Sequence, residues 1–398
     1  MMRAGADRRV ITPSIERPVW LAGFQPNRPA LGIQDNLYVR TLALQDGLGE
    51  LLVLSACDLI GVLRGEVLAI RAAAGRQGID ERAVHVIATH THHGPDTIGL
   101  WGPDPATTGR DPHYIDALCA SAVDSICAAV GRLAPACIRS ASAIVGGLAR
   151  NARDPGILDE ELSVLAAEDR AGRPIAALLC YPCHPEVLWR DNQWITPDYA
   201  GALCRALDET RGGVNLFVPG ALGGMMTPAV EEHSFSSCEA MGRALAAAAD
   251  EMLTASLPVE DAAISLARRE LAVPLENPLF RLAGAAGLLP FHALGGSVTT
   301  EIGYARVGAT TIAFLPGEPL PALGLGLKKR MPGDVRIVAG LSNDELGYIL
   351  PEAEFSYPEN PLEPGDHYEE TMSLGPRTAP VLLGALDELM RESGDASR

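Results

Sequence analysis

Short apolar runs rich in β-branched residues alternate along the chain with longer segments whose apolar residues recur at helical spacing. The first pattern predicts buried strands and the second predicts amphipathic helices. Strands are expected at residues 41–44, 51–55, 84–88, 163–167, 175–180, 214–218, 262–266, 272–274, 305–307, 311–315 and 335–339. Helices are expected at residues 65–75, 112–130, 197–209, 236–253, 320–330 and 378–392. This order predicts an α/β fold, with a mixed β-sheet flanked by helices in a single large domain.

Turn signals and strand ends add detail to this picture. The turns DGLG and DRAGR predict two hairpins, over 41–55 and 163–180. Five strands end in polar loops that contain Gly or Pro: THTHHGPD, YPCHPE, PGALGGMMTP, PGEP and GLSNDELGY. Ligands bind at the carboxyl ends of strands in open α/β sheets, so we expect these loops to converge on one site.

Charge and composition exclude several classes of protein. The chain has 398 residues and a formal charge of −18. Nucleic-acid binding and polybasic membrane contact both need a basic surface, so neither is expected. No uncharged apolar stretch of about 18 residues predicts a spanning helix, and no signal-peptide pattern opens the chain. We therefore expect a cytoplasmic protein that acts on a small-molecule or lipid-like neutral substrate, and a homo-oligomer is compatible with the sequence.

The cysteines carry less information. Eight are scattered through the chain, and Cys180 and Cys183 form a CxxC pair. Such a pair is found in redox centres and as half of a zinc site, but the sequence has no second CxxC. Core or loop thiols are the simpler interpretation.

Three histidines, His90, His92 and His93, fall within four residues at the end of an expected strand. Side chains at alternate positions of a strand share a face, and neutral imidazoles are common zinc ligands, so this cluster predicts a metal site. The metallo-β-lactamase pattern HxHxDH fails at Gly94 and Pro95. A carboxylated-lysine site needs a lysine in mid-chain, and the only lysines are Lys328 and Lys329.

Other loops offer partners for such a metal. His184 follows an expected strand, and Glu318 lies just past another, where a carboxylate is costly unless it is exposed or liganded. Tyr348 ends the GLSNDELGY loop. Taken alone, His184 can equally be an ordinary loop residue, and Tyr348 can equally be a core residue that only forms a hydrogen bond.

Eleven segments in order resemble the N-terminal catalytic domain of neutral/alkaline, non-lysosomal ceramidases and their shorter bacterial relatives. They read AGADRRVITPS (4–14), LAGF (21–24), IQDNLYVR (33–40), SACDLIG (55–61), ATHTHHGPD (88–96), CHPEVL (183–188), ITPDYAGAL (195–203), PGALGG with MMTP (219–228), LPGEP (315–319), SNDELGY (342–348) and HYEETMSLGPRTAP (367–380). The resemblance covers nearly the whole chain. It predicts one catalytic domain over 1–392, a disordered tail over 393–398 and no C-terminal immunoglobulin-like domain.

The resemblance also implies the site residues. One zinc ion would be held by His90, His184, Glu318 and Tyr348. Polarisation of the substrate carbonyl would fall to His92, and oxyanion contacts to Tyr368 and to Arg150, with Arg153 as the alternative register. Thr227 aligns with a serine proposed to attack or bind, Met225 replaces an aspartate of that loop, and His93 replaces a serine. The side chains expected to contact substrate are His93, Asp96, Met225 and Met226.

The expected chemistry is zinc-dependent hydrolysis of an amide (N-acyl) or ester-like bond by metal-activated water. The alternatives are ceramidase activity proper, lactone or ester hydrolysis, and a metal-dependent lyase or isomerase. The intact set of metal ligands argues against a non-catalytic binding protein. The apolar stretch 280–294 lines a pocket in one interpretation and is a packed helix or oligomer contact in the other.

Overall fold

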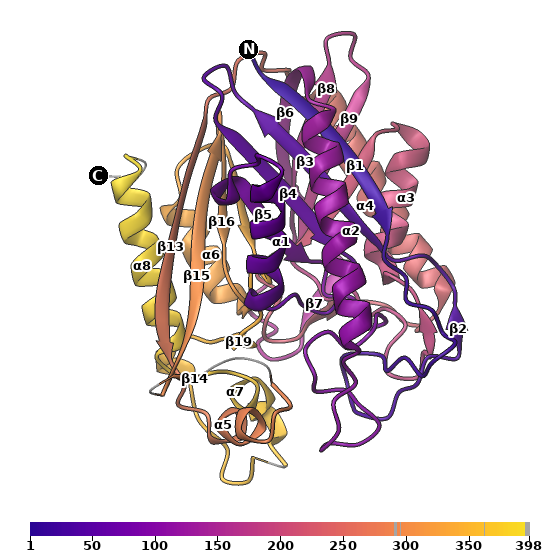
Figure 1. Cartoon of the computed structure of the whole chain (residues 1–398), viewed down its shortest axis with the longest axis vertical. Helices are drawn as coiled ribbons and strands as arrows, with labels where there is room; N and C mark the ends of the chain where they lie inside the picture. The colour runs from indigo at the N-terminus through magenta and orange to yellow at the C-terminus, as the bar shows by residue number, and fades with distance from the viewer. Residues whose placement is uncertain (290–292, 295, 362, 395–398) are drawn as a thin grey trace.

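Two β-sheets organise the protein. The computed structural model describes residues 1–289, 293–294, 296–361 and 363–394 (Figure 1). The eight-stranded sheet has the order β11 (Val214–Pro219), β9 (Pro174–Tyr181), β8 (Glu161–Asp169), β6 (Ala134–Ile144), β1 (Arg3–Val10), β3 (Tyr38–Gln45), β4 (Leu51–Cys57), β5 (Val84–Ala88). The five-stranded sheet is formed by β13 (Ile264–Pro274), β15 (Ser297–Val307), β16 (Thr310–Phe314) and β18 (Val335–Ala339), with β14 (Ala293–Leu294) paired to β15. Both sheets are mixed, because each contains parallel and antiparallel pairs.

The alternation of side chains along the strands turns these sheets into inner layers. In β3, Leu42 and Leu44 belong to a core shared with Phe314 and Ile337 of the smaller sheet, whereas Ala43 belongs to the core on the opposite face. Successive strand residues point to opposite faces, so both faces of the larger sheet are buried. The two sheets therefore pack face to face.

Helices cover the outer faces. The larger sheet carries α1 (Arg64–Arg76), α2 (Pro112–Gly131), α3 (Asp198–Thr210) and α4 (Phe235–Ala255), and the smaller sheet carries α6 (Pro321–Arg330) and α8 (Thr378–Glu392). Figure 1 shows α8 alongside β13 and β15 at one side and α1 and α2 in front of the larger sheet. The result is one α/β domain with helix, sheet, sheet and helix layers, so the predicted fold class is confirmed.

Short elements complete the structure. They are β2 (Gly32–Ile33), β7 (Ala149–Asn151), β10 (Trp194–Ile195), β12 (Met226–Pro228), β17 (Glu318–Pro319), β19 (Tyr348–Ile349), α5 (Pro278–Ala285), α7 (Tyr368–Thr371), and the 3-10 turns η1 (Glu81–Ala83), η2 (Glu352–Glu354) and η3 (Gly365–His367).

The predicted hairpins are β3–β4 and β8–β9, and both pair antiparallel. The expected strands at 262–266 and 272–274 are wrong in one respect, because β13 runs through both without a break. The prediction also missed β1 and β6. β1 reads RAGADRRV, and its small and charged residues hide the apolar alternation on which strand prediction depends.

Among the described residues one helix, α2, is long and apolar enough to cross a membrane by length and composition alone. Its residues Leu118, Ala122 and Ile126 belong to the core against the larger sheet, as in the core helices of globular domains. At the C-terminus α8 ends at Glu392. Of the predicted tail, residues 395–398 lie outside the described residues.

The edge strand β5 receives a loop from the smaller sheet. The Ala88 N–H donates to the Leu341 carbonyl at 3.1 Å. The Asn343 N–H donates to the Val86 carbonyl at 2.7 Å, and the Asn343 side-chain oxygen accepts the Val86 N–H at 2.9 Å. This docking brings the loop that leads to Tyr348 beside the end of the strand that leads to His90.

Candidate metal centre and adjoining cavities

Two imidazoles are each held by one ring nitrogen. His90 Nδ1 lies 2.7 Å from the Ile60 carbonyl, and His184 Nδ1 lies 2.9 Å from the Met226 carbonyl. A carbonyl only accepts, so each Nδ1 carries a proton, and Nε2 is the nitrogen that can bind a metal. Backbone acceptors of this kind fix the tautomer of metal-binding histidines.

The carboxylate of Glu318 lies between these two rings. Its Oε2 is 3.1 Å from His184 Nε2 and 3.4 Å from His90 Nε2. Burial by itself would raise the pKa of Glu318, but the two imidazoles outweigh it and hold that pKa at about 2. Burial lowers the pKa of His184, yet Glu318 and Glu186 outweigh it and raise that pKa to about 8. This group of donors therefore favours a positive charge at its centre, which suits a metal cation.

His92 completes a cluster of three imidazoles. Its ring centroid is 4.9 Å from that of His90 and 5.5 Å from that of His184, and each of the three side chains offers a nitrogen within 4.8 Å of the others. Burial, followed by the charges of His90 and His184, lowers the pKa of His92 well below its usual value. His92 is therefore neutral at pH 7, as a metal-binding or proton-accepting imidazole must be.

Glu186 supports His92 from behind. Its Oε2 lies 3.3 Å from His92 Nδ1, and the carboxylate is fully buried. Burial raises the pKa of Glu186, while His184 and the Thr227 hydroxyl act in the opposite direction. Sequence reasoning missed Glu186, although it follows His184 by two residues within the segment CHPEVL.

Tyr348 lies beside Glu318 because β17 and β19 pair in parallel with these residues in register. The Tyr348 hydroxyl donates to Met225 Sδ at 3.6 Å, and its ring is 6.0 Å from that of Tyr368. Burial raises the pKa of Tyr348 well above its usual value. The structure thus brings together the four predicted metal ligands, with His92 at the same cluster.

Left-handed backbone concentrates around this cluster. The φ angles of Phe24, His90, Trp189 and Met225 are +58°, +68°, +59° and +56°. Such conformations cost roughly 1 kcal/mol or more for a residue with a Cβ, and they cluster at functional sites. Gly23 allows the Phe24 loop to approach closely, because a Cβ at this position would lie 2.6 Å from the His92 ring.

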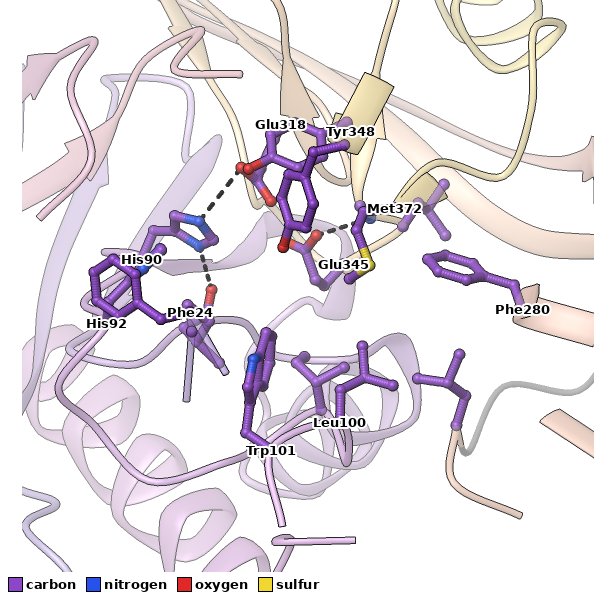
Figure 2. A pocket seen from close by; sticks show the side chains of 17 residues that line it. Phe24, His90, His92, Leu100, Trp101, Phe280, Glu318, Glu345, Tyr348 and Met372 are labelled. Carbon is purple, nitrogen blue, oxygen red and sulfur yellow. Dashed lines mark hydrogen bonds and ion pairs between the residues drawn. The ribbon is translucent and has the colours of Figure 1, made fainter. Parts of the chain in front are cut away.

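A largely apolar cavity opens on one side of the cluster (Figure 2). It is lined by Gly23, Phe24, Ile60, His90, His92, Ile98, Leu100, Trp101, Phe280, Leu289, Glu318, Glu345, Leu346, Gly347, Tyr348, Tyr368 and Met372. Phe280 and Leu289 come from the apolar stretch 280–294, so its described part contributes to a pocket; residues 290–292 and 295 lie outside the described residues.

A second cavity, with more polar side chains, adjoins the first. Four side chains, Phe24, His92, Tyr348 and Tyr368, line both cavities. The second cavity adds Gln25, Glu186, Trp189, Arg190 and Met225. Of the three imidazoles, His92 therefore lies where the two cavities meet and His90 lines the apolar cavity, whereas His184 is fully buried.

The remaining predicted residues are placed as follows. Tyr368 is 37% exposed and lines both cavities. Thr227 is buried in β12, opposite Arg150 of β7, and Arg150 itself is exposed. The alternative Arg153 lies 2.9 Å from Glu369 and 2.8 Å from Glu370, next to Tyr368. The Met226 side chain is buried, and the contribution of this residue to the cluster is its carbonyl.

His93 and Asp96 lie away from the apolar cavity, unlike the substrate contacts that were predicted for them. His93 is fully buried, with Nε2 3.4 Å from Asp198 and Nδ1 3.3 Å from the guanidinium of Arg28. Asp96 accepts the N–H groups of Ile98, Gly99, Trp101 and Gly109 at 2.7–3.2 Å. Asp96 therefore shapes the loop that carries Leu100 and Trp101 into the cavity wall.

Solved structures with a similar architecture are ceramidases. The neutral ceramidase from Pseudomonas aeruginosa gives a TM-score of 0.81 over 100% of this chain and 75% of that chain, at 18% sequence identity. A structure described as ceramidase complexed with C2 gives 0.80 over 100% of this chain and 76% of that chain, at 19% identity. No protein-family model and no curated protein match the sequence. The chain therefore has the fold of the neutral ceramidases.

Proposed function

We propose that this protein is a zinc-dependent hydrolase that cleaves an amide (N-acyl) bond. The observation that carries the proposal is the group of three imidazoles and a carboxylate, of which His90, His92 and Glu318 line the apolar cavity and His92 also lines the second cavity. A molecule with a central carbonyl can extend into both cavities from that point. The shared fold with neutral ceramidases supports the same chemistry.

The donor set fits one zinc ion. His90, His184 and Glu318 would hold it, with Tyr348 beside them, and imidazole nitrogens with a carboxylate oxygen are ligands typical of catalytic zinc. When bound, the ion supplies a Lewis acid that polarises a carbonyl and lowers the pKa of water. The identity of the ion as zinc, and the stoichiometry of one per chain, are part of the proposal.

The protein side chains provide binding and proton transfer. The buried, neutral His92 accepts or donates a proton at Nε2, because Glu186 lies 3.3 Å from its Nδ1. Tyr368 lines both cavities, and we assign its hydroxyl to a hydrogen bond with the oxyanion, for which one well-placed donor is worth about 3–4 kcal/mol. Arg153 already pairs with Glu369 and Glu370, so we assign it to positioning the Tyr368 helix.

Metal analysis combined with a substrate panel tests the proposal. Purified protein should contain zinc in stoichiometric amount and should hydrolyse some N-acyl amides in a panel of graded chain length, with esters and lactones included. Isotope from labelled water should appear in the product acid, which separates hydrolysis from lyase or isomerase chemistry. An absence of bound metal, together with an absence of any hydrolysis, would remove the proposal.

Thr227 offers a competing nucleophile, because a hydroxyl needs a neighbouring base and Glu186 lies beside it. We propose that water is the attacker. Replacement of Thr227 by Ala should leave measurable turnover. Complete loss of turnover, in a variant that retains its metal and its fold, would instead favour attack by Thr227.

A further inference from the structure

The apolar cavity contains a carboxyl group that the proposed mechanism does not use. Glu345 is 9% exposed and lines the cavity together with Ile98, Trp101 and Leu346 (Figure 2). Its Oε1 accepts the Gly347 N–H at 2.8 Å. Its Oε2 is buried, and no donor in the described part of the chain forms a hydrogen bond with it.

Within the described part of the chain, the charged side chains that act on the Glu345 carboxyl are those of Glu318 and Asp344, which are also acidic. The described lining of the cavity includes neither Lys nor Arg. Burial, followed by Glu318, raises the pKa of Glu345 well above its usual value. A buried polar atom without a hydrogen-bond partner is destabilising. The bond to Gly347 gives Oε1 a structural role, but it does not explain why Oε2 is buried.

The backbone opposite makes room for this side chain. A Cβ at Gly61 would lie 3.0 Å from Glu345 Cγ and 2.8 Å from Ile98 Cδ1. Gly61 therefore permits the carboxyl to sit in the cavity wall among apolar side chains. The arrangement is typical of ligand pockets, in which a few polar groups orient a molecule held by apolar contacts.

We propose that Glu345 determines substrate specificity by hydrogen-bonding a hydroxyl or ammonium group on the apolar portion of the substrate. The inference rests on the proposed function, because it places the carbonyl at His90 and the apolar portion in this cavity. A carboxylate or phosphate on that portion is excluded by the acidic surroundings of Glu345. A methyl group in the same place would leave Oε2 unpaired.

Three N-methyl amides test this proposal directly. Their acyl chains have equal length and end in a hydroxyl, an ammonium or a methyl group, and a second series carries the same three groups on the amine side. Binding to the metal-free protein is measured by calorimetry and hydrolysis by the metal-loaded protein as kcat/KM. In at least one series the wild type should bind the donor-bearing compounds about tenfold or more tightly than the methyl compound.

Variants of Glu345 assign the preference to this side chain. Glu345→Met should abolish or reverse the preference, and Glu345→Gln should retain it for the hydroxyl while weakening it for the ammonium. Glu352→Met, on the exposed turn η2, is the matched control and should leave the preference unchanged. Circular dichroism and melting temperature establish that each variant is folded.

The outcomes separate this proposal from the hydrolase proposal. Absence of a donor preference in both series, or a preference that survives in folded Glu345→Met, overturns the role of Glu345 even if amides are hydrolysed. A Glu345-dependent binding preference without hydrolysis of any amide supports the contact and contradicts the hydrolase. If Glu345→Met does not fold, Glu345→Gln provides the test. An ammonium preference in folded Glu345→Gln that equals the wild-type preference would overturn the proposal.

Discussion

Two buried histidine clusters lie side by side in this protein, and they differ in whether a protein cation belongs to the cluster. The ligand cluster consists of His90, His92, His184, Glu186 and Glu318. The guanidinium cluster consists of Arg28, His93 and Asp198. Adjacent residues, His92 and His93, thus belong to different clusters.

The guanidinium cluster contains its own cation. Arg28 donates to the carbonyls of Ala22, Gly23 and Asn192 at 3.0–3.1 Å, and its pKa, lowered by burial to about 10, still leaves it charged at pH 7. The Asp198 carboxylate accepts backbone N–H groups of Val187, Leu188 and Tyr199 at 2.7–3.2 Å. The ligand cluster has carboxylates and imidazoles but no guanidinium or ammonium among its described members. Buried histidines beside carboxylates therefore indicate a metal only where no protein cation occupies the centre.

Removal of a ligand should give the largest effect and is the most direct way to break this comparison. His184→Ala should lose bound metal and lower kcat/KM by more than about hundredfold, because outer partners of ligands alone account for ten- to hundredfold. Chelation should abolish activity in the wild type, and Zn²⁺ should restore it. The exposed His113→Ala is the control; equal metal content in the two variants would contradict the assignment.

Substitution of Arg28, the cation of the guanidinium cluster, should lower stability rather than metal binding. Arg28→Met leaves several buried carbonyls unpaired and should lower the free energy of unfolding by about 3–5 kcal/mol. Chemical denaturation measures the change, with exposed Arg17→Met as the control. The fraction that remains folded should still bind metal; a variant that keeps full stability but loses metal would show that Arg28 belongs to the ligand cluster.

A smaller effect is expected from Glu186, whose Oε2 lies 3.3 Å from His92 Nδ1. Glu186→Gln keeps the volume but removes the negative charge beside His92, and we expect metal affinity or kcat/KM to fall about ten- to hundredfold. Competition with a fluorescent zinc chelator measures the affinity. Glu209→Gln on the surface should match the wild type. If Glu186→Gln had the metal affinity and kcat/KM of the wild type, Glu186 would not be the residue that orients His92.

The smallest effect should appear in the pH dependence of stability. Burial lowers the pKa of His93 below its usual 6.5, so the unfolded chain binds a proton there more readily than the folded protein. The free energy of unfolding therefore has its full value, as far as His93 is concerned, above pH 6.5. It decreases as the pH falls from 6.5 toward the pKa of His93 in the folded protein. In metal-free protein, His93→Gln should flatten this part of the profile, as urea titrations on both sides of pH 6.5 would show.

Local patterns indicated a metal site at His90 and His92, and the resemblance implied His184, Glu318 and Tyr348; their metal-binding roles stay predictions. The neighbouring residues Glu186 and Arg28 were not predicted. The spacing HxH suggested that His90 and His92 share one side, and both side chains do belong to one cluster. Strand alternation is not the reason, because both residues lie beyond the end of β5 and His90 has left-handed backbone with a φ of +68°. The closeness of His93 to His92 suggested a substrate contact, yet His93 belongs to the guanidinium cluster. Thr227 and Tyr368 likewise lie near the cluster, as their segments indicated.

The rest of the site depends on contacts between distant parts of the chain. Arg28 meets His93, and Gly61 makes room for Glu345, only after separate loops have packed together. No local periodicity records such pairs. The strand β1 was missed for a different reason, because neighbouring strands and α2 bury a sequence that by itself is weakly apolar.

The docking of residues 341–343 onto β5 has a consequence for the order of folding. His90 and Tyr348 come together only when both sheets are formed and joined at that edge, so the site is made of contacts with very high sequence separation. Closing such contacts is entropically costly and slow, and it belongs to the last steps of folding. A tightly held metal would therefore report completed assembly, and its capture would draw late intermediates toward the native state by mass action.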